Sequence, residues 1–195
     1  MKAAIERQPR YWFPKPYADF VQRLRVVGGF VLLLAFAWLA QPSVLSLAIG
    51  LPVSFLGLML RAWAAGHLAK DRELATDGPY AYIRNPLYVG TLTVAFGIVI
   101  SAQNIWLAGL FAIVFLLVYL PAVELEEQHL RDIFPQYGAY AAQVNRFLPV
   151  RKFFGGGAPF SWQLYRTNEE FKAALGWVLA AAWLIWCCWL VRTLR

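Results

Sequence analysis

The sequence predicts an all-α protein, a polytopic membrane helical bundle of about five transmembrane helices with a cytoplasmic N-terminus. Hydrophobic residues make up 60% of the 195 residues, whereas charged residues make up only 15%. A soluble domain carries about 25% charged residues, so this chain has too little charge to cover a surface that faces water. Long apolar stretches and an uneven distribution of basic residues support the same fold class.

The apolar stretches approach the length that crosses a bilayer, which requires about 20 mostly apolar residues. Only Gln41 and Pro42 separate the first two stretches, and only Gln103 and Asn104 separate the third from the fourth. Such short connections predict two tight antiparallel hairpins. The expected spans cover residues 26–40, 43–63, 87–102, 105–123 and 173–191.

The basic residues indicate which way the bundle faces. Five spans place the N-terminal segment and both long connections on one side of the membrane. Of the 18 Lys and Arg residues, only Arg192 and Arg195 fall on the other side. Because basic segments stay in the cytoplasm, we expect a multi-pass protein of a bacterial-type inner membrane with its polar side cytoplasmic. No soluble basic domain is left over, so the net charge of +7 does not indicate a nucleic-acid partner.

Residue types also suggest details of the helices. Thr167, followed three residues later by Glu170, fits a capping box that begins the last helix. Cys187 and Cys188 are adjacent in an apolar run, which favours a structural role, and we expect no metal site. Glycines inside the spans allow close packing between helices. These glycines are Gly57, Gly97, Gly109 and Gly176.

One polar segment, residues 74–90, leads into the third span. A turn signal at residues 77–79 is followed by Asn85, which suits an N-cap, and by Pro86, which suits the first helical position. From residue types alone, the favoured interpretation is a turn with Arg84 as an anchor at the membrane boundary. The alternative is a site for a carboxylate or another anion, since free N–H groups at a helix start and a nearby Arg attract negative charge.

A second polar segment, with Glu124, Glu126 and Glu127, follows the fourth span directly. One interpretation is a solvated helix extension. It is supported by Glu127 and Arg131, which are four residues apart in the order that favours an ion pair. The other is that Glu126 or Glu127 faces a cationic ligand, because carboxylates at a partly dry interface attract cations.

Together these segments resemble a known superfamily. The first reads Gly-Pro-Tyr at residues 78–80 and Arg-Asn-Pro-Leu-Tyr-Val-Gly at residues 84–90. The second begins with the acidic pair at residues 126–127. Over roughly residues 57–150 the sequence is similar to the isoprenylcysteine carboxyl methyltransferase and phospholipid methyltransferase superfamily. The second motif continues through Leu130, Phe134, Tyr137, Tyr140, Val144, Arg146 and Pro149.

The resemblance implies an integral-membrane methyltransferase that uses S-adenosylmethionine. In such families the cofactor lies at the cytoplasmic boundary, between the turn before the helical hairpin and the acidic pair after it. The residues expected at the adenine end are Arg72, Glu73, Leu74 and Ala75, and those expected at the ribose and amino-acid portions are Tyr80, Asn85, Pro86, Leu87, Tyr88, Glu126 and Glu127.

The expected catalytic residues are Arg84, Glu127 and His129. An in-line methyl transfer to a carboxylate needs no base, whereas an amine or thiol has to lose a proton first. His129 and Glu124 are the candidate bases for that step. An exposed helix position is the alternative interpretation of His129.

The sequence departs from the superfamily pattern in places. Asn85 stands where His is frequent, and Pro135 stands where Gly is usual. Residues 121–123 read Pro-Ala-Val, whereas prenylcysteine enzymes place an Arg about one turn before the acidic pair. A prenylcysteine carboxylate would therefore lack its expected anchor.

The sequence therefore predicts one membrane-embedded domain over residues 1–195, with an interfacial segment and the last helix in residues 151–195. The expected function is methyl transfer from S-adenosylmethionine to a lipophilic acceptor, first a prenylcysteine-type carboxylate. A phospholipid amine and a small thiol are the alternative acceptors, and a non-enzymatic membrane protein is the alternative class. The expected partners are the lipid bilayer and the acceptor, and the sequence does not define an oligomeric state.

Overall fold

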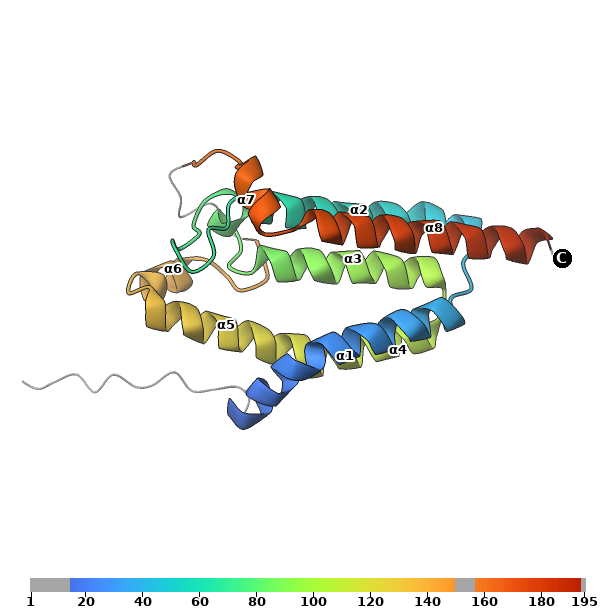
Figure 1. The fold of residues 1–195 in the computed structure, drawn as a ribbon, viewed down its shortest axis with the longest axis horizontal. Helices are drawn as coiled ribbons and strands as arrows, with labels where there is room; N and C mark the ends of the chain where they lie inside the picture. Colours follow the sequence, from blue (N-terminus) through green and yellow to red (C-terminus); the bar gives the residue numbers. More distant parts are fainter. Residues whose placement is uncertain (1–14, 150–156, 194–195) are drawn as a thin grey trace, which may run out of the picture.

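The computed structural model describes residues 15–149 and 157–193, and these ranges form helices without strands (Figure 1). The predicted all-α class is therefore confirmed. The elements are α1 (Lys15–Leu39), α2 (Val44–Ala65), η1 (Gly78–Ala81), α3 (Pro86–Ala102), α4 (Ile105–Val114), η2 (Phe115–Tyr119), α5 (Leu120–Ile133), α6 (Tyr137–Gln143), α7 (Trp162–Thr167) and α8 (Phe171–Thr193).

Within the described ranges, three helices are long and apolar enough to cross a membrane: Val44–Ala65, Ile105–Ile133 and Phe171–Thr193. Two shorter apolar helices, Val27–Leu39 and Pro86–Ala102, correspond to the remaining predicted spans. The predicted number of about five is therefore approximate, because the apolar part of α1 and the whole of α3 fall below the length of about 20 residues that a span requires.

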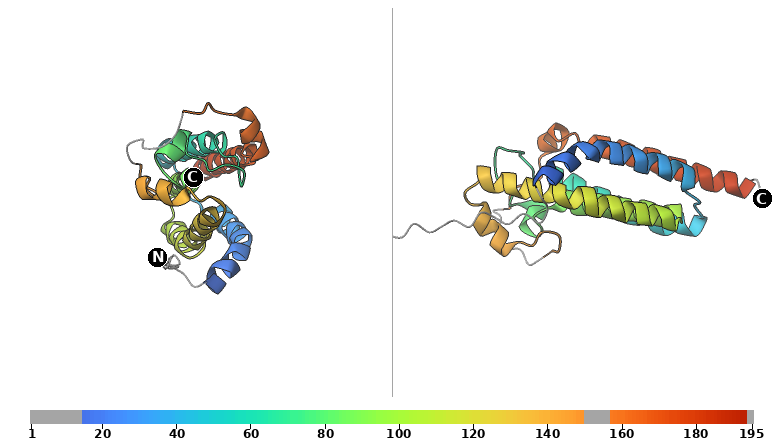
Figure 2. Two further views of the ribbon diagram at one scale, coloured as in Figure 1. Left: turned by 90° about the vertical axis from the view of Figure 1, so that its left-hand side faces the viewer. Right: turned by 90° about the horizontal axis from the view of Figure 1, so that it is seen from below.

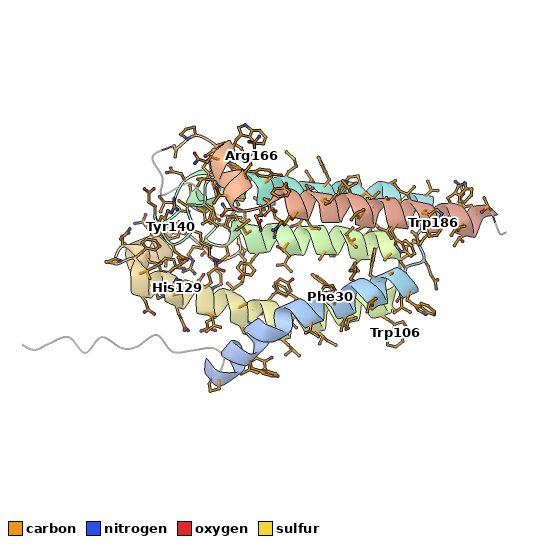
Figure 3. All side chains as sticks on the ribbon, in the orientation of Figure 1. Phe30, Trp106, His129, Tyr140, Arg166 and Trp186 are labelled. Carbon is orange, nitrogen blue, oxygen red and sulfur yellow. The ribbon has the colours of Figure 1, made fainter. Side chains whose placement is uncertain are left out.

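The outer surface of the bundle is apolar between two polar or aromatic ends. Leu56 in the middle of α2 and Leu179 in the middle of α8 are 66% and 63% exposed, which suits a surface covered by lipid. Figure 3 shows Trp106 and Trp186 toward one end of the bundle and His129 toward the other. Tryptophan at the rim of an apolar surface is typical of a membrane–water boundary.

Helices α2 and α3 form the most tightly packed part of the bundle. A methyl group on Gly57 would lie 2.5 Å from the backbone nitrogen of Val94 and 2.6 Å from the carbonyl oxygen of Gly90. The backbones of α2 and α3 can therefore come this close only because Gly57 has no side chain. Gly97 faces Ser54 of α2 in the same way. Close packing at Gly57 and Gly97 thus follows the prediction. At Gly109 and Gly176 the prediction is wrong, because no neighbouring atom of the described ranges lies within 4 Å of where a methyl group would be.

The helices divide into two groups. The end-on view in Figure 2 shows α2, α3 and α8 on one side and α1 beside the α4–α5 helix on the other. At one end, the Gln41 N–H donates to the Ala102 carbonyl at 2.8 Å, and the Asn104 amide donates to the Leu39 carbonyl at 2.9 Å. The two predicted hairpin turns therefore lie side by side, away from the polar connections.

The fourth span continues into the acidic segment without a break, from Ile105 to Ile133. Between α4 and α5 lies η2, a π-helical turn that ends two residues before Pro121. Proline lacks the N–H that would continue the α-helical ladder, so a wider turn at this place has a local cause. The continuous helix carries the acidic residues to the same end of the bundle as the start of α3.

The start of α8 differs from the predicted capping box. Thr167 is the last residue of α7, and Ser161 caps that helix by accepting from the Leu164 N–H at 3.3 Å. The Glu170 side chain is buried and binds Arg61 instead of a helix N-terminus. The predicted capping box at Thr167 and Glu170 is therefore wrong, because a charged residue in α2 takes up the carboxylate.

Candidate active site

The start of α3 lies against the acidic end of α5. Asn85 is the N-cap residue of α3 and Pro86 its first residue, as the sequence predicts. The Asn85 side chain makes no capping bond to its own helix. Its amide instead donates to Oε1 of Glu127 at 2.8 Å. Asn85, which the sequence predicts as a helix cap, thus links the start of α3 to α5 through Glu127, 42 positions later in the sequence.

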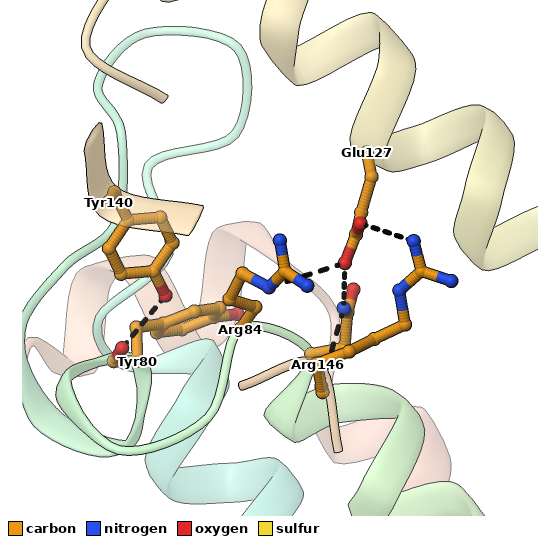
Figure 4. A network of polar contacts seen from close by, with 6 residues as sticks. Tyr80, Arg84, Glu127, Tyr140 and Arg146 are labelled. Carbon is orange, nitrogen blue, oxygen red and sulfur yellow. Dashed lines mark hydrogen bonds and ion pairs between the residues drawn. The ribbon is translucent and has the colours of Figure 1, made fainter. Parts of the chain in front are cut away.

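Glu127 is 2% exposed, and its carboxylate is surrounded by donors (Figure 4). Arg146 donates from Nη2 to Oε2 at 2.7 Å, and Arg84 Nε lies 3.7 Å from Oε1. These cationic neighbours offset the cost of burying the carboxylate. Arg131 does not take the predicted role of partner, since its guanidinium lies over the Tyr137 ring, 5.2 Å from the centroid. The interpretation of Glu127 as part of a solvated extension is therefore wrong.

The backbone holds the same region together. The Arg84 N–H donates to the Asn145 carbonyl at 2.9 Å, and Ile83 forms an isolated β-bridge with Asn145. The Tyr140 hydroxyl donates to the Tyr80 carbonyl at 2.8 Å (Figure 4). The segment after α5 thus fastens onto the connection that precedes α3.

The two neighbouring carboxylates of the acidic pair face different surroundings. Glu126 is exposed, and its Oε2 accepts a hydrogen bond from the Tyr88 hydroxyl at 2.8 Å. The Tyr88 ring meets the Tyr119 ring edge to face, with 6.5 Å between centroids. Of the pair, Glu126 therefore faces the side that a ligand can reach, and Glu127 lies in the wall behind it.

Tyrosines near this wall stay protonated at neutral pH. Burial raises the pKa of Tyr80 far above its ordinary value, and the negative charge of Glu126 raises it further. Burial raises the pKa of Tyr140 as well. The pKa of Tyr137 rises to about 12, first through burial and then through the charge of Glu127. These phenols are hydrogen-bonding and aromatic groups, not bases.

A cavity of about 1180 Å³ lies between the two groups of helices. Its polar part includes Arg84 and Glu126. Its apolar part includes Phe30 and Leu33 of α1 and Leu87 of α3. A ligand with a charged portion and a lipophilic portion matches this lining, because each portion meets groups of its own kind.

The structure gathers most of the predicted site residues around this cavity. Among the expected catalytic residues, Arg84 and His129 line it, and Glu127 lies behind the lining. His129 is at the water-facing side, with Nε2 3.3 Å from Asp71 Oδ1. Arg72 is exposed in the same loop, outside the lining, and Glu124 is buried. The expected cofactor-binding residues that line the cavity are Glu73, Leu74, Ala75, Tyr80, Asn85, Pro86, Leu87, Tyr88 and Glu126.

Sequence reasoning missed several residues of this region. Arg146 belonged to the motif, but it had no predicted role. Its ion pair with Glu127 forms because α6, which lies between them in the sequence, folds back against α5. Arg61 and Glu170 line the cavity as an ion pair. The useful signal was Arg61 itself, because an Arg inside an apolar span needs a polar partner or an exit to water, and a carboxylate is one such partner.

Comparisons with known proteins identify the family. The sequence profile that describes the phospholipid methyltransferase family matches residues 25–137, more than half of the chain. This match includes α2, α3 and both polar segments up to the start of α6. The resemblance inferred from the two motifs is therefore confirmed.

The chain is also similar to two proteins named for metal resistance. It is 33% identical over 164 residues to the nickel-cobalt-cadmium resistance protein NccN of Alcaligenes xylosoxydans xylosoxydans, covering 77% of this chain and 76% of that protein. It is 29% identical over 134 residues to the cobalt-zinc-cadmium resistance protein CzcN of Cupriavidus metallidurans, covering 68% of this chain and 61% of that protein. No solved structure matches the chain. The chain belongs to the phospholipid methyltransferase family, a family of membrane methyltransferases within the isoprenylcysteine carboxyl methyltransferase-like superfamily.

Proposed function

We propose that this protein transfers a methyl group from S-adenosylmethionine to a lipophilic acceptor, within the cavity between the two groups of helices. The observation that carries the proposal is the convergence of the α3 start and the acidic end of α5. They are linked by the bond of 2.8 Å between Asn85 and Glu127. Membership of a methyltransferase family supplies the reaction class.

The lining residues fit the cofactor in size and chemistry. A cavity of about 1180 Å³ has room for both a nucleoside and an acceptor headgroup. The loop at residues 73–75 offers backbone groups for the adenine, and Tyr80 and Tyr88 offer aromatic faces and hydroxyl or backbone groups. Glu126 offers a carboxylate for the cofactor's ammonium or hydroxyl groups. In this proposal Glu127 acts through Asn85, whose position it fixes.

The cofactor supplies an activated methyl group on a sulfonium, so the protein has to align donor and acceptor. Alignment can lower a barrier by roughly 7–11 kcal/mol at best. The network of Glu127, Arg84 and Arg146 holds the start of α3 in one position. The apolar wall at Phe30 and Leu33 would hold the acceptor's hydrocarbon portion and keep bulk water from the reacting groups.

We propose two candidate acceptors, a prenylcysteine-type carboxylate as the first and a phospholipid amine as the second. The name of the matched family, phospholipid methyltransferase, supports the second candidate. An amine has to lose a proton, and His129 is the candidate base that lines the cavity, whereas the other predicted base, Glu124, is buried outside the lining. A small thiol is a further alternative acceptor.

Labelled methyl donor distinguishes these acceptors. Membranes that contain the protein are incubated with methyl-labelled S-adenosylmethionine and extracted. Volatile label released by base indicates a methyl ester and therefore a carboxylate acceptor. Label that is extracted with the lipids and stays non-volatile after base treatment excludes a methyl ester and indicates a methylated amine or thiol, which chromatography of the extracted product distinguishes. If membranes with and without the protein incorporate equal label into every fraction, methyl transfer is not its function.

The named relatives suggest a biological setting. We propose that methylation by this protein supports tolerance of divalent transition metals. The proposed contribution is the methyl-transfer reaction, which membership of a methyltransferase family supports. Deleting the gene should increase sensitivity to cobalt, and an inactive Arg84→Ala copy should fail to restore growth.

The rival class is a membrane protein without enzymatic activity, such as an assembly factor or a permease. Binding of S-adenosylhomocysteine to the purified protein, measured as heat release, separates the classes. We further propose that the whole chain acts as one domain, with the cavity on the cytoplasmic side of a bacterial inner membrane. The basic residues of the long connections support this orientation.

A further inference from the structure

An ion pair outside the predicted site lies in the wall of the same cavity. Arg61 is one turn before the end of α2, and Glu170 directly precedes α8. The guanidinium donates from Nε to Oε1 at 2.6 Å and from Nη2 to Oε2 at 2.9 Å. The side chains of Arg61 and Glu170 are 23% and 6% exposed. A bidentate pair of this kind fixes the plane of the guanidinium.

Helix α3 confines Arg61 from the other side. Nη1 donates to the hydroxyl of Thr91, and that hydroxyl donates to the Leu87 carbonyl at 2.8 Å. The Arg61 stem passes over Gly90, where an added methyl group would lie 2.6 Å from Cγ. The guanidinium therefore has one defined position, between α3 and the start of α8.

The bonding pattern leaves donors for a ligand. A guanidinium has five N–H groups, and the bonds to Glu170 and Thr91 use three of them. The others belong to Nη1 and Nη2 of a side chain that lines the cavity. We propose that Arg61, positioned by Glu170, binds the anionic group of the lipophilic methyl acceptor, a carboxylate or a phosphate. The inference depends on the proposed function only in treating this ligand as the acceptor.

Two further observations favour Arg61 for this role. The acidic segment has no Arg just before it, since residues 121–123 are Pro-Ala-Val. Of the other cations of the lining, Arg84 lies beside Glu127 and Lys70 is exposed. Arg61, in contrast, is fixed within the cavity wall by Glu170 and Thr91.

Arg61 and the apolar side chains Phe30 and Leu33 line one cavity, so an anionic headgroup and a hydrocarbon chain can be bound together. Glu170 lies beyond the family match at residues 25–137 and therefore adds a feature from the C-terminal segment.

The test uses amphiphiles that differ only in their headgroup. The purified full chain in maltoside micelles is titrated with dodecanoate, dodecyl phosphate or uncharged dodecanol at matched mole fractions and mildly alkaline pH. Binding is measured from the increase in the unfolding temperature. At least one anionic probe should bind about tenfold tighter than dodecanol, the effect of one or two charge-assisted hydrogen bonds. Preference for dodecanoate identifies a carboxylate, and preference for dodecyl phosphate identifies a phosphate. Equal binding of all three probes overturns the proposal.

The variants separate the anchor from the fold. Removing Arg61 alone would leave a buried carboxylate, so the main variant is the double substitution Arg61→Met with Glu170→Met, which replaces the pair by apolar side chains. It should fold and lose the anionic preference. Arg61→Lys keeps the charge without the planar fork and should lower the preference several-fold.

The matched control is Arg131→Gln, which removes a cation outside the cavity lining and should keep the full preference. If the double variant, or Arg61→Lys where the double variant does not fold, keeps the wild-type preference, Arg61 is not the anchor. Binding of S-adenosylhomocysteine is measured on the same samples. Its absence would contradict the proposed methyl transfer, whereas the amphiphile comparison tests the anchor without the cofactor.

Discussion

At Glu127, burial and charge balance act on the same side chain. The carboxylate is nearly inaccessible, and it bonds to Asn85 and Arg146 with Arg84 close by. Removing one partner of such a cluster leaves charge uncompensated in a dry place, which costs about 3–5 kcal/mol. The cluster therefore stabilises the local structure and at the same time defines where α3 begins.

Glu127→Gln should abolish most methyl transfer. Glutamine has nearly the same shape, but it removes the negative charge beside Arg84 and Arg146 and lets Asn85 move. A displacement of about 1 Å in an aligned site costs about 100-fold in rate. The rate is measured with labelled methyl donor on purified protein, and Arg84→Ala should change it in the same direction.

The matched control is Glu169→Gln, which removes an exposed carboxylate paired with Lys172 at 2.6 Å. This variant should keep the wild-type rate. Full activity in both Glu127→Gln and Arg84→Ala would remove these residues from the site.

Tyr137 provides a pH-dependent prediction. Its pKa is about 12 in the folded protein, against an ordinary value of 10.0, so the unfolded chain loses this proton first as pH rises. The contribution to stability is complete below pH 10 and is lost as pH rises towards 12. Unfolding measured from pH 9 to 12 should show this loss, and Tyr137→Phe should weaken it. An unchanged alkaline profile in Tyr137→Phe would contradict the assignment.

At the scale of elements, α2 and α3 depend on glycine at their crossing. Gly57→Ala places a methyl group 2.5 Å from the Val94 nitrogen, which requires the helices to separate. Overpacking of this kind costs about 1–3 kcal/mol. Gly109→Ala meets open space and should gain up to about 1 kcal/mol from helix propensity. Thermal unfolding in micelles compares the two variants, and equal changes in stability would contradict the close approach.

The sequence predicted the helices well where their cause is local. Apolar length located all five apolar helices, and Asn85 and Pro86 located the start of α3. The Thr167–Glu170 capping box was wrong because its partner is distant: Arg61 is 109 positions away from Glu170. A glutamate such as Glu170 can serve in a helix cap or in a buried ion pair. Only the packing of α8 against α2, which brings Arg61 to Glu170, distinguishes the two roles.

At the scale of the whole molecule, the two groups of helices meet through their turns at one end and through side chains at the other. The cavity lies near the side-chain end, between α1, α3 and α5. The motifs predicted this convergence, because the superfamily pattern pairs the two polar segments. They did not predict that Glu127 lies behind the cavity lining or that Arg146 holds it, since both depend on how α6 folds back.

Hydrogen exchange of the purified protein with and without S-adenosylhomocysteine tests whether the start of α3 and the acidic end of α5 bind one cofactor together. Backbone amides in residues 72–88 and in residues 122–130 should gain protection together, while α4 stays unchanged. Protection in only one of these segments, or in neither at saturating ligand, would contradict a single cofactor pocket formed by the start of α3 and the acidic end of α5.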